Sequence, residues 1–377
     1  MLESVQKVSK NRLLLLNLGG PRAASEIPKF LMDLFEDPLV FDLPIPEALR
    51  LYLARKIAES RSKKVQEVYA SMGFGGGSPL VSETERQAKE LQKLLEKSGE
   101  KWEIKIAMAC GYPHIREIDP EWLDPRNGVI ILPLFPHFSR STVLSTAMIL
   151  KSKLGFCPIS YEGWIQPFFD KSEYLESVRD LILDFFNGHL ENSKFLHLHN
   201  KKVKDWQNID IVFSAHGIPM RLVHKGDDYV REIERNTNEL VSLLREAGYR
   251  GNTHLAFQSR VGPSKWTTPN TLNLLEELSK AKVSRVAIYP ISFVSDHLET
   301  LEEIGVQMRD KAKSLGFQDY YRIPTPGTYP PFIRALATII ERAKAASNKG
   351  TNVRTVCTCK SLGGFDPSKE KVLCSSH

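Results

Sequence analysis

Short apolar runs alternate along this chain with longer segments of helical periodicity. The apolar runs occupy residues 13–18, 104–108, 129–134, 209–213, 254–257 and 286–289. Near-continuous apolar runs of this kind are typical of parallel strands that helices cover on both faces. The helical segments occupy residues 83–97, 174–186, 229–247, 268–279, 298–315 and 331–346. This alternation predicts an α/β fold built on parallel sheets flanked by helices.

Local signals predict where several of these helices begin and end. Thr268 and Pro269 predict a helix start, since a capping residue is followed by proline at the first helical position. Gly248 and Gly316 follow helical segments and predict helix ends.

The length of 377 residues predicts two domains. Two parallel sheets fit that length, the first within residues 11–161 and the second within residues 162–345. Residues 346–377 lose the apolar periodicity and predict a flexible C-terminal tail.

The charge and the cysteine content of the chain indicate which partners it binds and in which cellular compartment it works. The 51 Lys and Arg exceed the 45 Asp and Glu by only six, and no concentrated basic run accompanies the excess, so we expect no nucleic-acid partner. Five cysteines, an odd number, predict reduced thiols and not a disulfide framework. The N-terminus lacks the apolar core of a signal peptide, and Leu13–Leu16 is too short to span a membrane. We therefore expect a cytoplasmic protein.

The residues that follow the apolar runs are the most informative about chemistry, because ligands of parallel α/β sheets bind beyond the carboxyl ends of the strands. His216 follows one such run and precedes Gly217, which leaves one face of the imidazole open. Two interpretations stay open: a core or capping histidine, or a base or metal ligand.

A second strand end carries Asp296, His297 and Glu299 just before a helical segment. Acids at a helix start complement the helix dipole, which explains Asp296 and Glu299 but explains His297 poorly. If the two strand ends meet, His216 and these residues form a two-walled site of nitrogen and oxygen ligands. Such a site suits a divalent metal such as Fe(II) and also suits proton abstraction.

Two glycine-rich or apolar segments give weaker signals. No GxGxxG follows the first apolar run, and residues 73–79 lack the Lys-Ser/Thr of a phosphate-binding loop. Residues 30–53 are apolar with interleaved acids and prolines, which predicts neither a regular helix nor a membrane span. This segment is either a long connection packed on the first sheet or an apolar lip that holds a flat ligand and contacts a membrane surface.

The chain from residue 11 to about residue 346 resembles the ferrochelatase family. The matching motifs are residues 16–21 (LNLGGP), 75–79 (GGGSP), 135–139 (FPHFS), 213–219 (FSAHGIP), 257–263 (FQSRVGP) and 292–301 (SFVSDHLETL). The resemblance implies two Rossmann-like domains with a porphyrin cleft between them, and Fe(II) as a substrate with no required cofactor. It implies that His216 and Glu299 handle the metal and the protons, with Asp296 and His297 beside them.

The sequence departs from the family at two places. Many members have an Arg-Tyr pair lining the cleft where this chain has Ala109 and Cys110. Animal-type members bind a [2Fe–2S] cluster through three C-terminal cysteines and one near the FPHFS motif, where this chain has Arg140. The tail cysteines are differently spaced here: Cys357, Cys359 and Cys374. A cluster normally needs four thiolates, so we expect none.

The resemblance therefore implies insertion of Fe(II) into protoporphyrin IX, which gives protoheme in the terminal step of heme biosynthesis. The alternatives are a chelatase for coproporphyrin III or another tetrapyrrole, and a non-catalytic tetrapyrrole or metal carrier.

Overall fold

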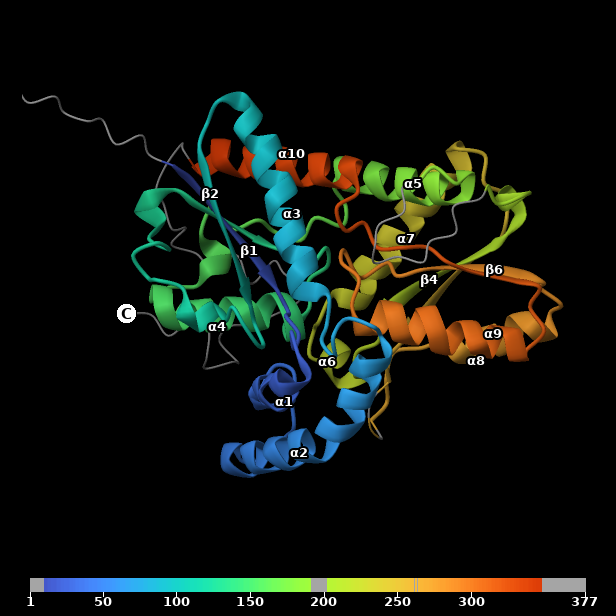
Figure 1. The fold of residues 1–377 in the computed structure, drawn as a ribbon, viewed down its shortest axis with the longest axis horizontal. Coiled ribbons are helices and arrows are strands. Elements are labelled where there is room, and N and C mark those ends of the chain that lie inside the picture. The colour runs from blue at the N-terminus through green and yellow to red at the C-terminus, as the bar shows by residue number, and fades with distance from the viewer. Residues whose placement is uncertain (1–9, 191–201, 261, 263, 348–377) are drawn as a thin grey trace, which may run out of the picture.

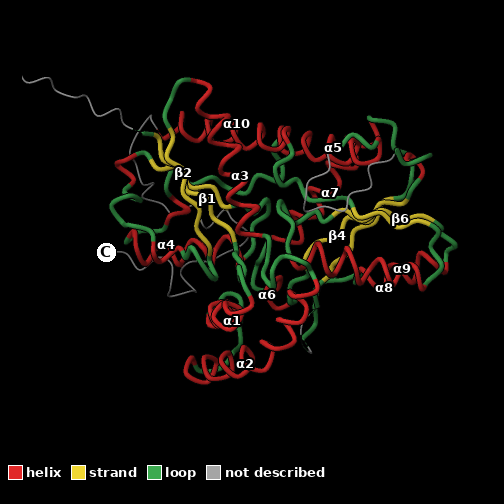
Figure 2. The backbone as a smooth tube through the Cα atoms, viewed as in Figure 1, coloured by secondary structure: helices red, strands yellow, loops and turns green. Residues whose placement is uncertain are grey.

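Two purely parallel sheets form the frame of the molecule (Figure 2). A computed structural model describes residues 10–190, 202–260, 262 and 264–347. The first sheet has the order β2-β1-β3, with β1 Asn11–Asn17, β2 Trp102–Met108 and β3 Val129–Pro133. The second has the order β5-β4-β6-β7, with β4 Asp210–His216, β5 Thr253–Gln258, β6 Arg285–Tyr289 and β7 Asp319–Arg322. The predicted α/β class is confirmed.

Helices cover both sheets. Their bounds are α1 Ile27–Glu36, α2 Glu47–Ser71, α3 Leu80–Leu95, α4 Ser145–Leu154, α5 Ser172–Asn187, α6 Met220–His224, α7 Tyr229–Glu246, α8 Thr271–Lys280, α9 Arg309–Ser314 and α10 Pro330–Ser347. Gly248 and Gly316 have φ of +91° and +86°, so the predicted helix ends are confirmed. A π-helix, Glu299–Met308, leads into α9.

Two local predictions were wrong. The helix expected to begin at Thr268 begins at Thr271, because the Asn270 side chain accepts the backbone N–H of Leu272 at 3.0 Å and caps it. Residues 30–53 were expected to lack a regular helix, yet they contain most of α1 and the start of α2. The prolines that suggested irregular structure, including Pro38 and Pro44, lie in the connection between these helices.

One continuous hydrophobic core joins the two sheets. It contains Leu13 and Leu15 of β1, Ile211 and Phe213 of β4, and Phe332 of α10. α10 packs against α3 and β3 as well as α5, and Figure 1 shows it running along one side of the molecule. The boundary expected near residue 161 stays a prediction.

Candidate active site at the carboxyl ends of β4 and β6

The ends of two hydrogen-bonded strands place the candidate residues at one edge of the second sheet. His216 is the last residue of β4, and β6 is followed by the loop 290–298 and the π-helix. Because β4 and β6 are parallel neighbours, their carboxyl ends lie together. Gly217 follows His216 where the backbone approaches β5 closely, and a Cβ there would lie 2.8 Å from the Gln258 carbonyl oxygen. The glycine is therefore required by packing.

An aromatic ring links the two histidines. The Phe293 ring centroid lies 6.2 Å from that of His216 and 4.4 Å from that of His297, with edge-to-face geometry in both contacts. His216, Phe293 and Glu299 are partly exposed, whereas His297 is buried. His216 and His297 thus both contact the Phe293 ring, and their roles at this site stay predictions.

The two imidazoles differ in how their nitrogens are used. His297 Nδ1 lies 2.9 Å from the Ser295 carbonyl oxygen, and Nε2 lies 3.1 Å from Glu299 Oε2. Since a carbonyl oxygen only accepts, Nδ1 carries a proton, and Nε2 forms an ion pair with Glu299 when it is protonated as well. The Gly217 backbone hydrogen-bonds the His216 ring, and among the residues that the structure describes no side chain does so. One ring nitrogen of His216 is therefore still open to a ligand.

Burial sets the charge of His216. Burial lowers its pKa below the ordinary value, the Glu299 charge opposes this by raising it, and His297 lowers it further. The pKa remains lowered, so the imidazole is neutral at pH 7 and can accept a proton.

Asp296 has structural contacts. Its buried carboxylate accepts a hydrogen bond from Thr300 Oγ1 at 2.8 Å and pairs with Arg322 Nη1 at 3.1 Å. These contacts tie the loop after β6 to β7. The geometry favours a role for Asp296 in holding the loop, and its catalytic role stays a prediction.

Two further residues, not predicted from the sequence, belong to this site. Burial, reinforced by the Glu299 charge, raises the pKa of Glu303 to about 7, and Ser259 and Gln258 hydrogen-bond its carboxylate. Tyr69, near the end of α2, is buried and lies close enough for the Glu299 charge to help raise its pKa. Glu303 could have been found from the sequence, because it lies four residues after Glu299 and therefore near the same helix face. No feature of the sequence around Tyr69 indicated that it belongs to this site.

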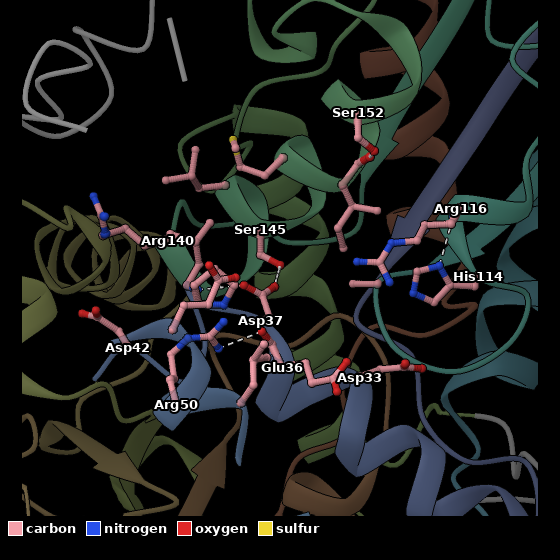
Figure 3. A pocket seen from close by; sticks show the side chains of 18 of the residues that line it. Asp33, Glu36, Asp37, Asp42, Arg50, His114, Arg116, Arg140, Ser145 and Ser152 are labelled. Atoms are coloured by element: carbon pink, nitrogen blue, oxygen red, sulfur yellow. Dashed lines mark hydrogen bonds between the residues drawn. The ribbon is translucent and has the colours of Figure 1, made fainter. Parts of the chain in front are cut away.

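A well-formed cavity lies elsewhere in the molecule. It has a volume of about 580 Å³ and lies between the α1–α2 region and α4 (Figure 3). Neither His216 nor Glu299 lines it, but Ala109 and Arg140 do. Both positions that depart from the family pattern therefore face this cavity.

The absence of a [2Fe–2S] cluster stays a prediction, because the structure describes only two of the five cysteines. Cys110 and Cys157 are buried and form no disulfide, and burial raises the pKa of Cys110. Cys357, Cys359 and Cys374 lie outside the described residues. Within the described ranges, no group of three or more His, Cys, Asp or Glu side chains is arranged to hold a metal ion.

Comparison with known proteins identifies the family of this chain. The Ferrochelatase family model matches residues 10–344. A ferrochelatase of Leptospira borgpetersenii serovar Hardjo-bovis is 56% identical over 368 residues, which cover 97% of this chain and 99% of the relative. A ferrochelatase of Leptospira biflexa serovar Patoc is 49% identical, covering 93% and 95%, and one of Parasynechococcus marenigrum is 38% identical, covering 88% and 82%. The chain belongs to the ferrochelatase family.

Proposed function

We propose that this protein inserts Fe(II) into protoporphyrin IX to give protoheme, with His216 accepting pyrrole protons and Glu299 handling iron and protons. Iron insertion into a porphyrin follows from the family. The choice of porphyrin and the residue roles are the proposal. The observation that supports it is a neutral imidazole with one ring nitrogen open, set across Phe293 from the His297–Glu299 pair.

Metal insertion must expose the pyrrole nitrogens and remove two protons. Contacts at the porphyrin periphery can supply roughly 1–5 kcal/mol to bend a flat macrocycle. The His216 imidazole, being neutral, is suited to take a proton from a pyrrole N–H, a role worth about 10²–10⁴ in rate.

The carboxylates then balance charge and carry protons away. Glu299 offers an anionic oxygen to the dication, and its Oε2 lies 3.1 Å from His297 Nε2, close enough to pass a proton between them. Glu303 lies one turn further along the π-helix, and its pKa of about 7 lets it take up and release a proton near neutral pH. Iron enters and remains as Fe(II), so the reaction needs no redox cofactor.

An anaerobic turnover assay separates this proposal from its alternatives. Protein at catalytic concentration is supplied with Fe(II) and either protoporphyrin IX or coproporphyrin III, and porphyrin absorbance is followed. We expect many turnovers and a higher kcat/KM for protoporphyrin IX. Consumption that stops at one equivalent would identify a carrier, and a preference for coproporphyrin III would identify the other chelatase.

We also propose that α2 contacts a membrane surface. Leu49 and Tyr52 are 47% and 58% exposed, and the basic residues Arg55, Lys56 and Lys64 are exposed on the same helix. Exposed apolar side chains beside cations suit the interface of an anionic bilayer. No helix in the described ranges is long and apolar enough to cross a membrane, so such contact would be peripheral.

Cosedimentation with vesicles tests this contact. Vesicles containing phosphatidylglycerol should retain the wild type, and Leu49→Glu with Tyr52→Glu should weaken retention about tenfold. Leu272→Glu, at another exposed leucine, is the matched control and should bind normally. Equal retention of all three proteins would exclude α2 as the contact.

A further inference from the structure

The backbone of His216 is held by a side chain where the strand ladder stops. β4 pairs with β6 as far as Phe213 and Tyr289, and the Ile291 N–H then donates to the Ser214 carbonyl at 3.1 Å. The next N–H on that side of β4 belongs to His216 and has no strand carbonyl to meet. The Ser292 hydroxyl accepts it at 3.0 Å. Ser292 thus takes the place of a ladder acceptor at the residue that carries the candidate base.

A buried tyrosine completes this contact. The Tyr229 hydroxyl hydrogen-bonds the Ser292 side chain and the His216 backbone. Burial raises the pKa of Tyr229, so the phenol stays protonated and supplies both a donor and an acceptor.

Tyr229 is itself fixed by the FPHFS segment of the first half of the chain. Its backbone N–H donates to Asp227 Oδ1 at 3.1 Å, and Asp227 Oδ2 accepts the Arg140 N–H at 2.9 Å. Its ring lies edge-on to His137, with centroids 6.1 Å apart, and His137 hydrogen-bonds Asn236 at 3.0 Å. A chain of buried contacts therefore runs from the turn after β3 to His216.

We propose that Ser292 and Tyr229 are positioning residues that hold His216 in the orientation needed to accept pyrrole protons. The inference rests on the proposed role of His216. Small errors in the placement of a reacting group lower its effectiveness steeply, by up to about 10²-fold for 1 Å. Neither residue needs to touch the porphyrin for this role.

The matched variants are Ser292→Val and Ser292→Thr, which have nearly the same shape and differ in the hydroxyl. Ser292 is partly exposed, so one added methyl group has space. We expect Ser292→Val to lower kcat about tenfold with KM for porphyrin within about twofold, and Ser292→Thr to restore kcat to within about threefold. Tyr229→Phe should resemble Ser292→Val. Thermal unfolding midpoints identify any variant that is unfolded.

A double-mutant cycle with His216→Ala tests whether the effect acts through the histidine. Single-turnover rates are measured with protein in excess of porphyrin. Ser292→Val should change the rate of the His216→Ala protein by less than about twofold. An equal loss in both backgrounds, or equal rates for folded Ser292→Val and Ser292→Thr proteins, would overturn the inference. Normal turnover by His216→Ala alone would instead overturn the role proposed for His216.

Discussion

His216 and His297 both contact the Phe293 ring, but their imidazole nitrogens have different partners. Both nitrogens of His297 already have partners, which orients its ring and commits it to Glu299. The His216 ring has the Gly217 backbone as a hydrogen-bond partner, which leaves one nitrogen open, and burial keeps the ring neutral. The site thus places a base with one open nitrogen near a carboxylate that lies beside His297. A sequence shows which residue types follow a strand, but not which nitrogen is in use.

Glu299→Gln tests the carboxylate with little change in size. We expect a loss of turnover of at least about tenfold, because an amide neither accepts a proton nor balances a dication. If Glu299 only complements a helix dipole, the variant should lose less than about 1 kcal/mol of stability and keep its rate. A rate within about a factor of two of the parent would support that simpler role.

At the scale of elements, α7 and the FPHFS segment are linked through a buried carboxyl. Glu232 accepts the Phe138 N–H at 2.6 Å, and burial raises its pKa from the ordinary 4.5 to about 8. The folded protein therefore holds a proton between about pH 4.5 and 8 that the unfolded chain has released, so stability falls as the pH rises through this range.

Glu232→Gln should remove this dependence. The amide oxygen can still accept the Phe138 N–H, so we expect little change at pH 5 and a gain of roughly 1–3 kcal/mol above pH 8. Urea unfolding of the wild type and the variant at both pH values measures the difference in their free energies of unfolding. Glu234→Gln, at an exposed residue of α7, is the control and should change neither value. A variant destabilised most at pH 8 would contradict the assignment.

α10 is the element that ties the two sheets together. Phe332 is fully buried in the shared core, whereas Arg334 on the same helix is exposed. Phe332→Ala should lower the free energy of unfolding by about 3–5 kcal/mol, and Arg334→Ala by less than about 0.5 kcal/mol. If Phe332→Ala lowered the free energy of unfolding in chemical denaturation as little as Arg334→Ala does, α10 would not be an integral part of the core.

In the whole molecule, the periodicity of the sequence predicted the strands and helices that depend on local burial. It did not predict the features that depend on contacts between distant segments. Six of the seven described strands coincide with predicted apolar runs. The seventh, β7, has the sequence DYYR and is a short, half-buried edge strand without an apolar run. The order of strands, the π-helix and the approach of Tyr69 to Glu299 arise from packing between segments far apart in the sequence. The motifs placed His216 and Glu299 at strand ends, and the structure brings both to one edge of a sheet.

The C-terminal tail is expected to be dispensable. Anaerobically prepared protein with ample iron and sulfide should show no cluster absorbance, because a four-thiolate site would need Cys110 or Cys157, both buried, in addition to the three tail cysteines. Truncation after Ala346 should leave turnover mostly intact. Stoichiometric acid-labile sulfide, lost together with activity in the truncated protein, would contradict both expectations.

The most direct test of the central claim is Fe(II) insertion into protoporphyrin IX by folded His216→Ala, with porphyrin binding measured on the same sample. Turnover should fall by at least about 100-fold while the Kd for porphyrin stays within about twofold, because the imidazole moves protons and does not hold the ring. Near-normal turnover by the folded variant would contradict the claim.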